Sequence, residues 1–158
     1  FSEASDDVIV GAFKSNLGLM KGLLKLDPKV CAGLVRPDQF PMNFDRYVKL
    51  TEGPLATIME QIEFHNEAAL FGPVQKQKRL TKKELAVATR RFAKVFPKVY
   101  RQFTTKEMKR IMSKGKPVKG RDEALFCRYY IASFEVLLKN PDAMFFLFRH
   151  GAEFLEQP

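Results

Sequence analysis

The chain contains no tryptophan, and it has only two histidines and two cysteines among its 158 residues. Metal sites and nucleophile–histidine pairs need these side chains, so both kinds of site have little to draw on. Long apolar runs are also absent: the longest unbroken one, Ala143 to Phe148, is far shorter than the roughly 20 residues that span a bilayer. The sequence therefore predicts no transmembrane segment, no metal site and no other cofactor.

The two cysteines, Cys31 and Cys127, are too few for a disulfide framework, and both fall at apolar positions of predicted helices. This placement favours two buried thiols in a reducing compartment such as the cytoplasm. The alternative is a single bridge, with Cα atoms about 5.5 Å apart, which would indicate an extracytoplasmic domain of a larger or processed protein. The early acidic residues Glu3, Asp6 and Asp7 are not typical of a signal peptide.

Apolar residues recur with helical spacing, and no run alternates as a strand would. We therefore expect an all-α fold, a single compact domain over residues 1–158 with six or seven helices, arranged as a helical bundle or an orthogonal helical array. The fifteen phenylalanines predict a phenylalanine-rich core. Its expected helices are the N-terminal one at 6–26, a second at 55–71 and the two C-terminal ones, with a helix at 82–102 packed against them.

Local signals mark several helix ends. Ser5, Asp27, Asn43, Thr81 and Thr104 are expected N-caps, and the last two are each followed three residues later by glutamate, which predicts capping boxes. Within the first helix, Gly18 and Gly22 lie four residues apart and each costs about 1 kcal/mol against alanine. We expect another helix to approach closely there.

Charge is distributed very unevenly along the chain, whose overall net charge is +9. Residues 75–121 contain 17 Lys or Arg and two acids, a net charge of +15, whereas the rest of the chain has a net charge of −6. If the two ends of the chain pack together as the core, this basic segment supplies a basic surface.

The densest part of this segment, Thr81 to Phe103, is predicted to be one two-faced helix, which Pro97 should bend or split. On a helical projection six cations fall within an arc of roughly 100°. They are Lys83, Arg90, Arg91, Lys94, Lys98 and Arg101. The opposite side carries the residues Leu85, Ala88, Phe92, Val95, Phe96, Val99 and Phe103.

These cations lead to a functional hypothesis. We expect a non-catalytic interaction domain that presents this basic helical face to an acidic partner protein or an anionic membrane surface. Lys114, Lys116 and Lys119 of the following loop would assist the six cations. Nucleic-acid binding by the same residues is the alternative, although the exposed side lacks the interleaved aromatic residues of a single-strand stacking surface. A small helical enzyme is a third and less favoured function.

Two other patterns are weaker. The segment 115–122, GKPVKGRD, spaces its glycines like a phosphate-binding loop, but Arg121 and Asp122 replace the Lys-Ser/Thr pair and the flanking segments look helical, so we reject nucleotide binding. Glu60, Glu63 and Glu67 share a helix face near His65, which raises a metal site. A di-iron helix would need Glu-x-x-His, whereas the residue three before His65 is Ile62.

Catalysis finds little support. A cysteine–histidine pair would have to use His65 or His150 with an exposed, electropositive thiol, yet both cysteines fall in apolar registers. His150 lies near a predicted helix C-terminus, where a histidine complements the helix dipole. The sequence thus predicts neither catalytic nor metal-binding residues.

Overall fold

The structure is a computed structural model that describes residues 4–72, 80–113 and 122–155. Within these ranges the chain forms nine helices and no strand, which confirms the all-α fold. They are α1 (Asp6–Leu26), α2 (Pro28–Val35), α3 (Phe44–Thr51), α4 (Ala56–Phe71), α5 (Lys82–Ala93), α6 (Phe96–Tyr100), α7 (Thr105–Met112), α8 (Glu123–Leu138) and α9 (Pro141–Leu155). The predicted count of six or seven is slightly low, because breaks such as those near Pro28 and Pro97 divide the chain into more and shorter helices.

The helix ends follow the capping signals with one exception. Asp27 accepts hydrogen bonds from the backbone N–H groups of Lys29 and Val30, and Asn43 accepts one from that of Arg46. Thr81 and Thr104 each form a complete capping box. Ser5 stands at the N-cap of α1 but makes no side-chain capping bond, so only its position was predicted correctly.

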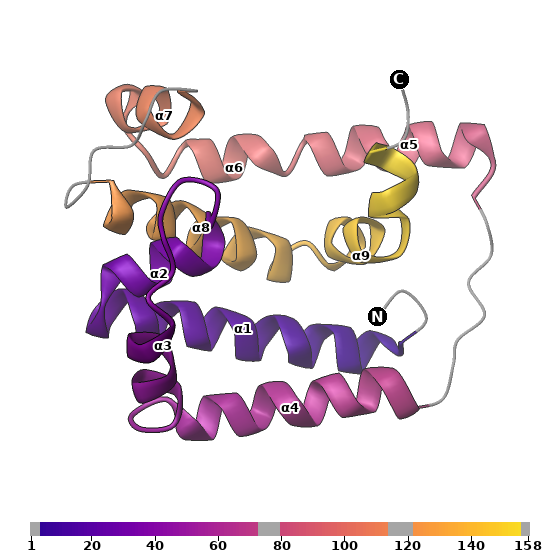
Figure 1. The fold of residues 1–158 in the computed structure, drawn as a ribbon. Coiled ribbons are helices and arrows are strands. Elements are labelled where there is room, and N and C mark those ends of the chain that lie inside the picture. The colour runs from indigo at the N-terminus through magenta and orange to yellow at the C-terminus, as the bar shows by residue number, and fades with distance from the viewer. Residues whose placement is uncertain (1–3, 73–79, 114–121, 156–158) are drawn as a thin grey trace.

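Figure 1 shows the longer helices in successive layers. α4 lies along one edge, α1 next to it, α8 and α9 beyond α1, and α5 with α6 along the opposite edge, while α3 and α7 run across this direction. This is a mixed array and not a regular bundle. No helix in the described part of the chain is both long enough and apolar enough to cross a membrane.

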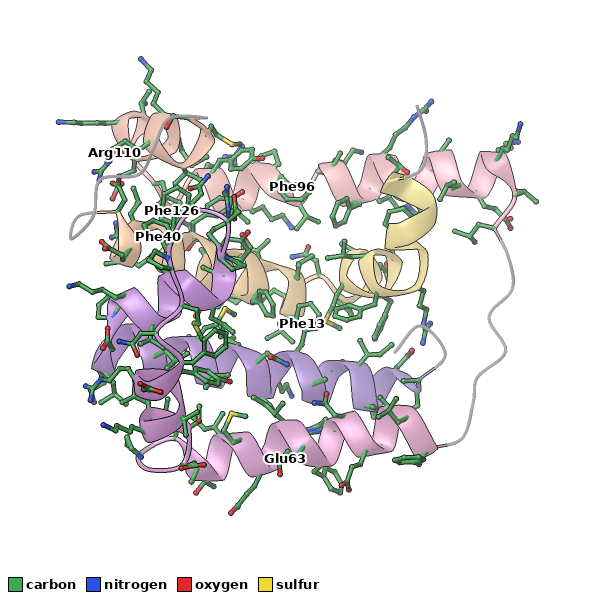
Figure 2. All side chains as sticks on the ribbon, in the orientation of Figure 1. Phe13, Phe40, Glu63, Phe96, Arg110 and Phe126 are labelled. Atoms are coloured by element: carbon green, nitrogen blue, oxygen red, sulfur yellow. A yellow bond between two sulfur atoms is a disulfide. The ribbon has the colours of Figure 1, made fainter. Side chains whose placement is uncertain are left out.

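Two apolar clusters form the core, and α1 and α8 contribute to both. Phe13 of α1 lies at the centre of the molecule (Figure 2), with its ring 4.7 Å from that of Phe134 on α8 and 4.7 Å from that of Phe148 on α9. Near the other end of α8, Phe126 packs edge-on against Phe40 at 5.4 Å. The predicted phenylalanine-rich core is thus organised around the α1–α8 pair.

The expectation that residues 55–71 form part of the central core is wrong. α4 lies at the edge of the molecule, where it packs on α1 and α3, and Ile62 is its only buried residue. The apolar periodicity of this helix correctly gives its inner side, but that side is narrow. Most of its remaining surface is exposed.

The favoured interpretation of the cysteines as two free thiols is also wrong. Cys31 of α2 and Cys127 of α8 form a disulfide with Cα atoms 5.9 Å apart, and both residues are fully buried. The apolar register that suggested inert thiols places both side chains at the α2–α8 contact, where they meet next to Met20 of α1. Burial in a common interior and pairing are therefore compatible, and sequence alone did not separate them.

The glycines of α1 allow α4 to approach, as the sequence predicted for Gly18 and Gly22. Ile58 of α4 lies near Gly18, and Leu55, just before α4, lies against Gly22. Gly11 continues this seam, because the imidazole ring of His65 occupies the space where a Cβ would stand. The ring is held by a 2.6 Å hydrogen bond between Nδ1 and the carbonyl oxygen of Gln61.

The disulfide closes a loop with a sequence separation of 96 residues. We expect the Cys31→Ala/Cys127→Ala variant to lose about 4 kcal/mol of unfolding free energy, since the bridge restricts the unfolded chain. Guanidinium unfolding of the variant beside the native protein measures this loss. Two thiols titrating in unfolded protein that has met no reductant would contradict the bridge.

The glycine seam gives a matched pair of substitutions. Gly11→Ala should destabilise the fold by about 1–3 kcal/mol, because the added methyl group overlaps the His65 ring. Gly18→Ala should stabilise it by up to about 1 kcal/mol, since the nearest atoms to its added Cβ are those of Ile58 at 3.8 Å and alanine is the better helix former. Thermal unfolding of both variants tests this difference, and equal effects would refute the close contact.

Candidate basic binding face

The basic helix begins at a capping box. The backbone N–H of Thr81 donates to Glu84 Oε2 at 2.8 Å, and the N–H of Glu84 donates to Thr81 Oγ1 at 3.3 Å. Glu84 is therefore engaged at the helix start, where a carboxylate also complements the helix dipole. The following two turns carry the cations.

The predicted helix is split, as Pro97 indicated. Because Pro97 has no N–H, the carbonyl of Ala93 loses its helical donor, and the chain passes through shorter bonds from Lys94 N–H to Arg91 O and from Val95 N–H to Phe92 O. α5 and α6 nevertheless continue nearly end to end along one edge of the molecule (Figure 1). The split leaves the cationic residues along a single edge.

Apolar residues fix α5 and α6 on the core. Leu85, Phe92, Val95 and Val99 are all buried, and the ring of Phe92 lies 5.7 Å from that of Phe146 on α9. Figure 2 labels Phe96, which follows the split and packs edge-on against Phe92 at 4.9 Å. With this side buried, the opposite side of both helices must face outward.

All six predicted cations, Lys83, Arg90, Arg91, Lys94, Lys98 and Arg101, are exposed, and we call them the basic face. None of the six forms an ion pair with any residue in the described ranges. Lys98 Nζ donates to Asn140 Oδ1 at 2.8 Å, a neutral partner at the junction of α8 and α9. The charge of the face is thus not neutralised within the described structure.

A groove of about 420 Å³ runs between α5 and α9 beside the basic face. Val87, Ala88 and Phe146 supply apolar lining, and Lys83 and Arg91 bring two cations of the basic face to it. Two acids, Glu84 of the capping box and Asp142 of α9, also line it. We call this hollow the α5–α9 groove; it combines an apolar lining with a charged rim.

The structure brings only part of the predicted site together. Lys83 and Arg91 share the α5–α9 groove, whereas Arg90, Lys94 and Arg101 are exposed without lining it. The predicted loop residues Lys114, Lys116 and Lys119 lie outside the described residues, so their role stays a prediction.

Sequence reasoning missed further exposed cations. Lys82 precedes Lys83 at the start of α5, Lys106 and Lys109 lie on α7, and Lys139 lines a second hollow of about 310 Å³ next to Arg91. The three-residue spacing of Lys106 and Lys109 was a usable signal. The position of Lys139 was not, since it depends on how α9 turns away from α8.

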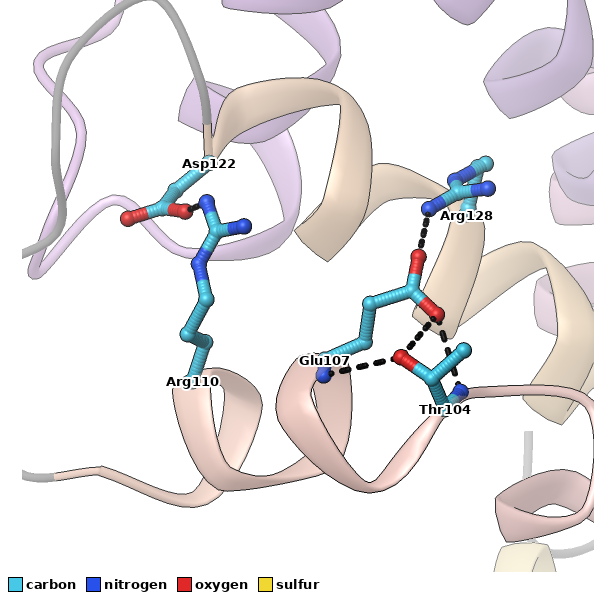
Figure 3. Close-up of polar contacts among 5 residues, drawn as sticks. All are labelled: Thr104, Glu107, Arg110, Asp122 and Arg128. Atoms are coloured by element: carbon cyan, nitrogen blue, oxygen red, sulfur yellow. Dashed lines mark hydrogen bonds and ion pairs between the residues drawn. The ribbon is translucent and has the colours of Figure 1, made fainter.

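Two arginines of this region are neutralised by acids, in a small network between α7 and α8 (Figure 3). Arg110 forms an ion pair with the buried carboxylate of Asp122, and Arg128 forms one with Glu107 at 2.6 Å. Asp122 was expected to occupy the N-terminus of α8, and it stands at that N-cap while pairing with Arg110. This network docks α7 and removes both arginines from the cations free to bind a partner.

Hydrogen bonding lowers the pKa of Glu107. The largest cause is the backbone N–H of Thr104, followed by the Arg128 side chain and the Thr104 hydroxyl. All three favour the ionised carboxylate in the folded protein. Glu107 therefore joins the capping box of α7 to the ion pair with α8.

The acidic residues of α4 and His65 do not converge. Glu60, Glu63 and Glu67 are exposed, whereas His65 turns to α1, where it lies against Gly11 with Nδ1 3.4 Å from Ser15 Oγ. No group of three metal-ligating side chains occurs in the described part of the chain. Ser15 Oγ donates to the Gly11 carbonyl, and His65 Nδ1 is engaged with Gln61, so this contact fits a helix seam and not a nucleophile with its base.

Comparison with known proteins found no matching family model, no matching curated protein and no matching solved structure. Function therefore has to be argued from the geometry of this chain.

The lowered pKa of Glu107 predicts a pH dependence. Above the usual glutamate pKa of about 4.3 the ionised group stabilises the fold, and this contribution is lost as pH falls through the lower folded-state pKa. Glu107→Gln should therefore be less stable than the native protein near neutral pH, and the difference should shrink as pH falls below about 4. Chemical unfolding across this pH range, with the exposed Glu52→Gln as control, measures it. A pH-independent difference would contradict this role.

Proposed function

We propose that this chain is a non-catalytic interaction domain that binds an acidic partner through the basic face of α5 and α6. The observation that carries this proposal is the row of six exposed cations without an ion pair to any described residue. Uncompensated charge of one sign raises the local potential and draws partners of the opposite sign.

The surroundings of the face favour a protein partner over a membrane. Membrane-surface helices insert large apolar side chains beside their cations. On α5 and α6 the phenylalanines face the core, and Val87 is their one large apolar residue that is markedly exposed in the described structure, at 44%. The adjoining α5–α9 groove has an apolar lining and a size suited to a single side chain of a partner protein.

The disulfide extends the proposal to the compartment. A buried bridge between Cys31 and Cys127 is typical of proteins that fold under oxidising conditions. We therefore favour an extracytoplasmic setting for the interaction, in place of the cytoplasmic one that free thiols suggested.

Nucleic acid remains the alternative partner, because phosphates would meet the same cations. The described exposed surface of α5 and α6 offers no aromatic side chain for base stacking. α7 is only eight residues long, and its Arg110 is paired with Asp122, which leaves little for base recognition.

Binding of labelled polyglutamate, measured by fluorescence anisotropy over a salt series, tests the proposal. The variant Arg90→Glu/Lys94→Glu/Lys98→Glu/Arg101→Glu should bind at least about 10-fold more weakly, since it reverses the basic face. A matched control reverses four exposed lysines elsewhere and has the same net charge. It is Lys14→Glu/Lys25→Glu/Lys29→Glu/Lys49→Glu.

The control should keep most of the affinity. Equal weakening of both variants, or no binding by the native protein at low salt, would refute the basic face as the site. Vesicles containing phosphatidylserine and a labelled DNA duplex and single strand, measured in parallel, decide between partner classes. Tighter binding to either DNA form than to polyglutamate would make nucleic acid the partner.

A further inference from the structure

The outer side of α4 is an unusual surface. Three large apolar residues are highly exposed there, Phe64 at 66%, Leu70 at 71% and Phe71 at 85%. On a helical projection they share an arc of about 120° with three exposed carboxylates, Glu60, Glu63 and Glu67. We call these six residues the acidic face.

A solvated helix face carries charged and polar residues, and a large apolar patch usually marks an interaction site. The inner side of α4 already supplies what its packing on α1 needs, through Ile58, Ile62 and the seam at His65. The exposed phenylalanines therefore contribute nothing to the fold. Their arrangement suits a partner surface that is both basic and apolar.

The basic face and the α5–α9 groove together have this character. Along α5, Arg90 and Lys94 lie on one side of Lys83, while Val87 and Ala88 lie on the other, towards the groove. On the acidic face a row of carboxylates likewise runs beside the row formed by Phe64 and Phe71. Both surfaces therefore have a charged row next to an apolar row, with opposite charge.

The spacings also agree. Glu60 and Glu67 are seven residues apart on α4, about 10.5 Å along the helix, and so are Lys83 and Arg90 on α5. The second pair bears the opposite charge, so two helices laid side by side could pair both rows. The two acids in the groove, Glu84 and Asp142, leave it locally balanced, so the phenylalanines would enter the groove while the carboxylates meet the cations beside it.

The two surfaces cannot meet within one molecule. α4 lies along one edge and α5 with α6 along the opposite edge, with α1, α8 and α9 between them (Figure 1). A second copy can present its acidic face to the basic face of the first, which leaves one unused face on each copy. Such a contact is heterologous, so it continues as an open chain or closes into a ring.

We propose that a second copy of this chain is a partner of the basic face, and that the protein self-associates head to tail through the acidic face of α4 and the α5–α9 groove. This inference rests on the proposed function, because it identifies the acidic partner. One helix face against another is a small interface, so the association is weak and salt-dependent.

Sedimentation velocity of the native protein, from about 10 to about 500 μM, covers the range of weak association. The mean mass should rise with concentration at low salt and fall towards the monomer at high salt. Phe64→Ser/Phe71→Ser removes the apolar row, and Phe44→Ser, which alters a 70% exposed phenylalanine on α3, is its control. Arg90→Gln/Lys94→Gln removes cations, and Lys25→Gln/Lys49→Gln is the matched control.

The α4 variant and the basic-face variant should each remain monomeric, while both controls associate like the native protein. An equimolar mixture of the two variants should form a dimer and nothing larger, because only one intact pair of faces remains. A native protein that stays monomeric throughout, or controls that lose association equally, would overturn the proposal. So would a mixture that fails to dimerise.

Polyglutamate binding separates this inference from the proposed function. The α4 variant keeps the basic face, so it should bind polyglutamate like the native protein. If polyglutamate binds but the native protein does not self-associate, the acidic partner is another protein and only the second copy is excluded. If polyglutamate does not bind, the proposed function itself fails, and the inference falls with it.

Discussion

The packing of α1 against α8 is the contact on which the rest of the fold depends. Both helices contribute to both apolar clusters, and Phe13 of α1 and Phe134 of α8 meet at the centre. α2 is joined to α8 by the disulfide, α4 lies on the glycine seam of α1, and α6 and α9 pack on α8. A change that separates α1 from α8 would therefore loosen every other layer.

This central pair also keeps the charges of the protein apart. The basic face lies outside α8 and α9, and the acidic face lies outside α1, so neither can neutralise the other within one molecule. Like charges such as Arg90 and Lys94, four residues apart, cost a helix about 0.2–0.5 kcal/mol per pair. The chain bears this repulsion on α5 while other arginines, Arg110 and Arg128, are paired with acids. Uncompensated charge confined to one edge supports a role for that edge in binding.

The two surfaces differ in how their apolar residues are used. On α5 and α6 the phenylalanines anchor the helices to the core, and the apolar lining of the groove comes from smaller residues and from Phe146 of α9. On α4 the phenylalanines point outward because the glycines of α1 bring the two helices so close that small contacts suffice. A close helix contact leaves large side chains for other surfaces, which is why the exposed apolar area gathers on α4.

The amino-acid sequence by itself determined the helices, their caps, the split at Pro97 and the exposure of the six cations. Each of these depends on neighbours within a few residues, through hydrogen bonding at helix ends, the missing N–H of proline and the helical period. Tertiary structure alone decided that Cys31 and Cys127 meet, that α4 lies at the edge, that Arg110 and Arg128 are neutralised, and that a groove opens between α5 and α9. These features join residues far apart in the chain. Their distances depend on how helices pack, and helical periodicity shows which side of a helix is buried without showing which helix will cover it.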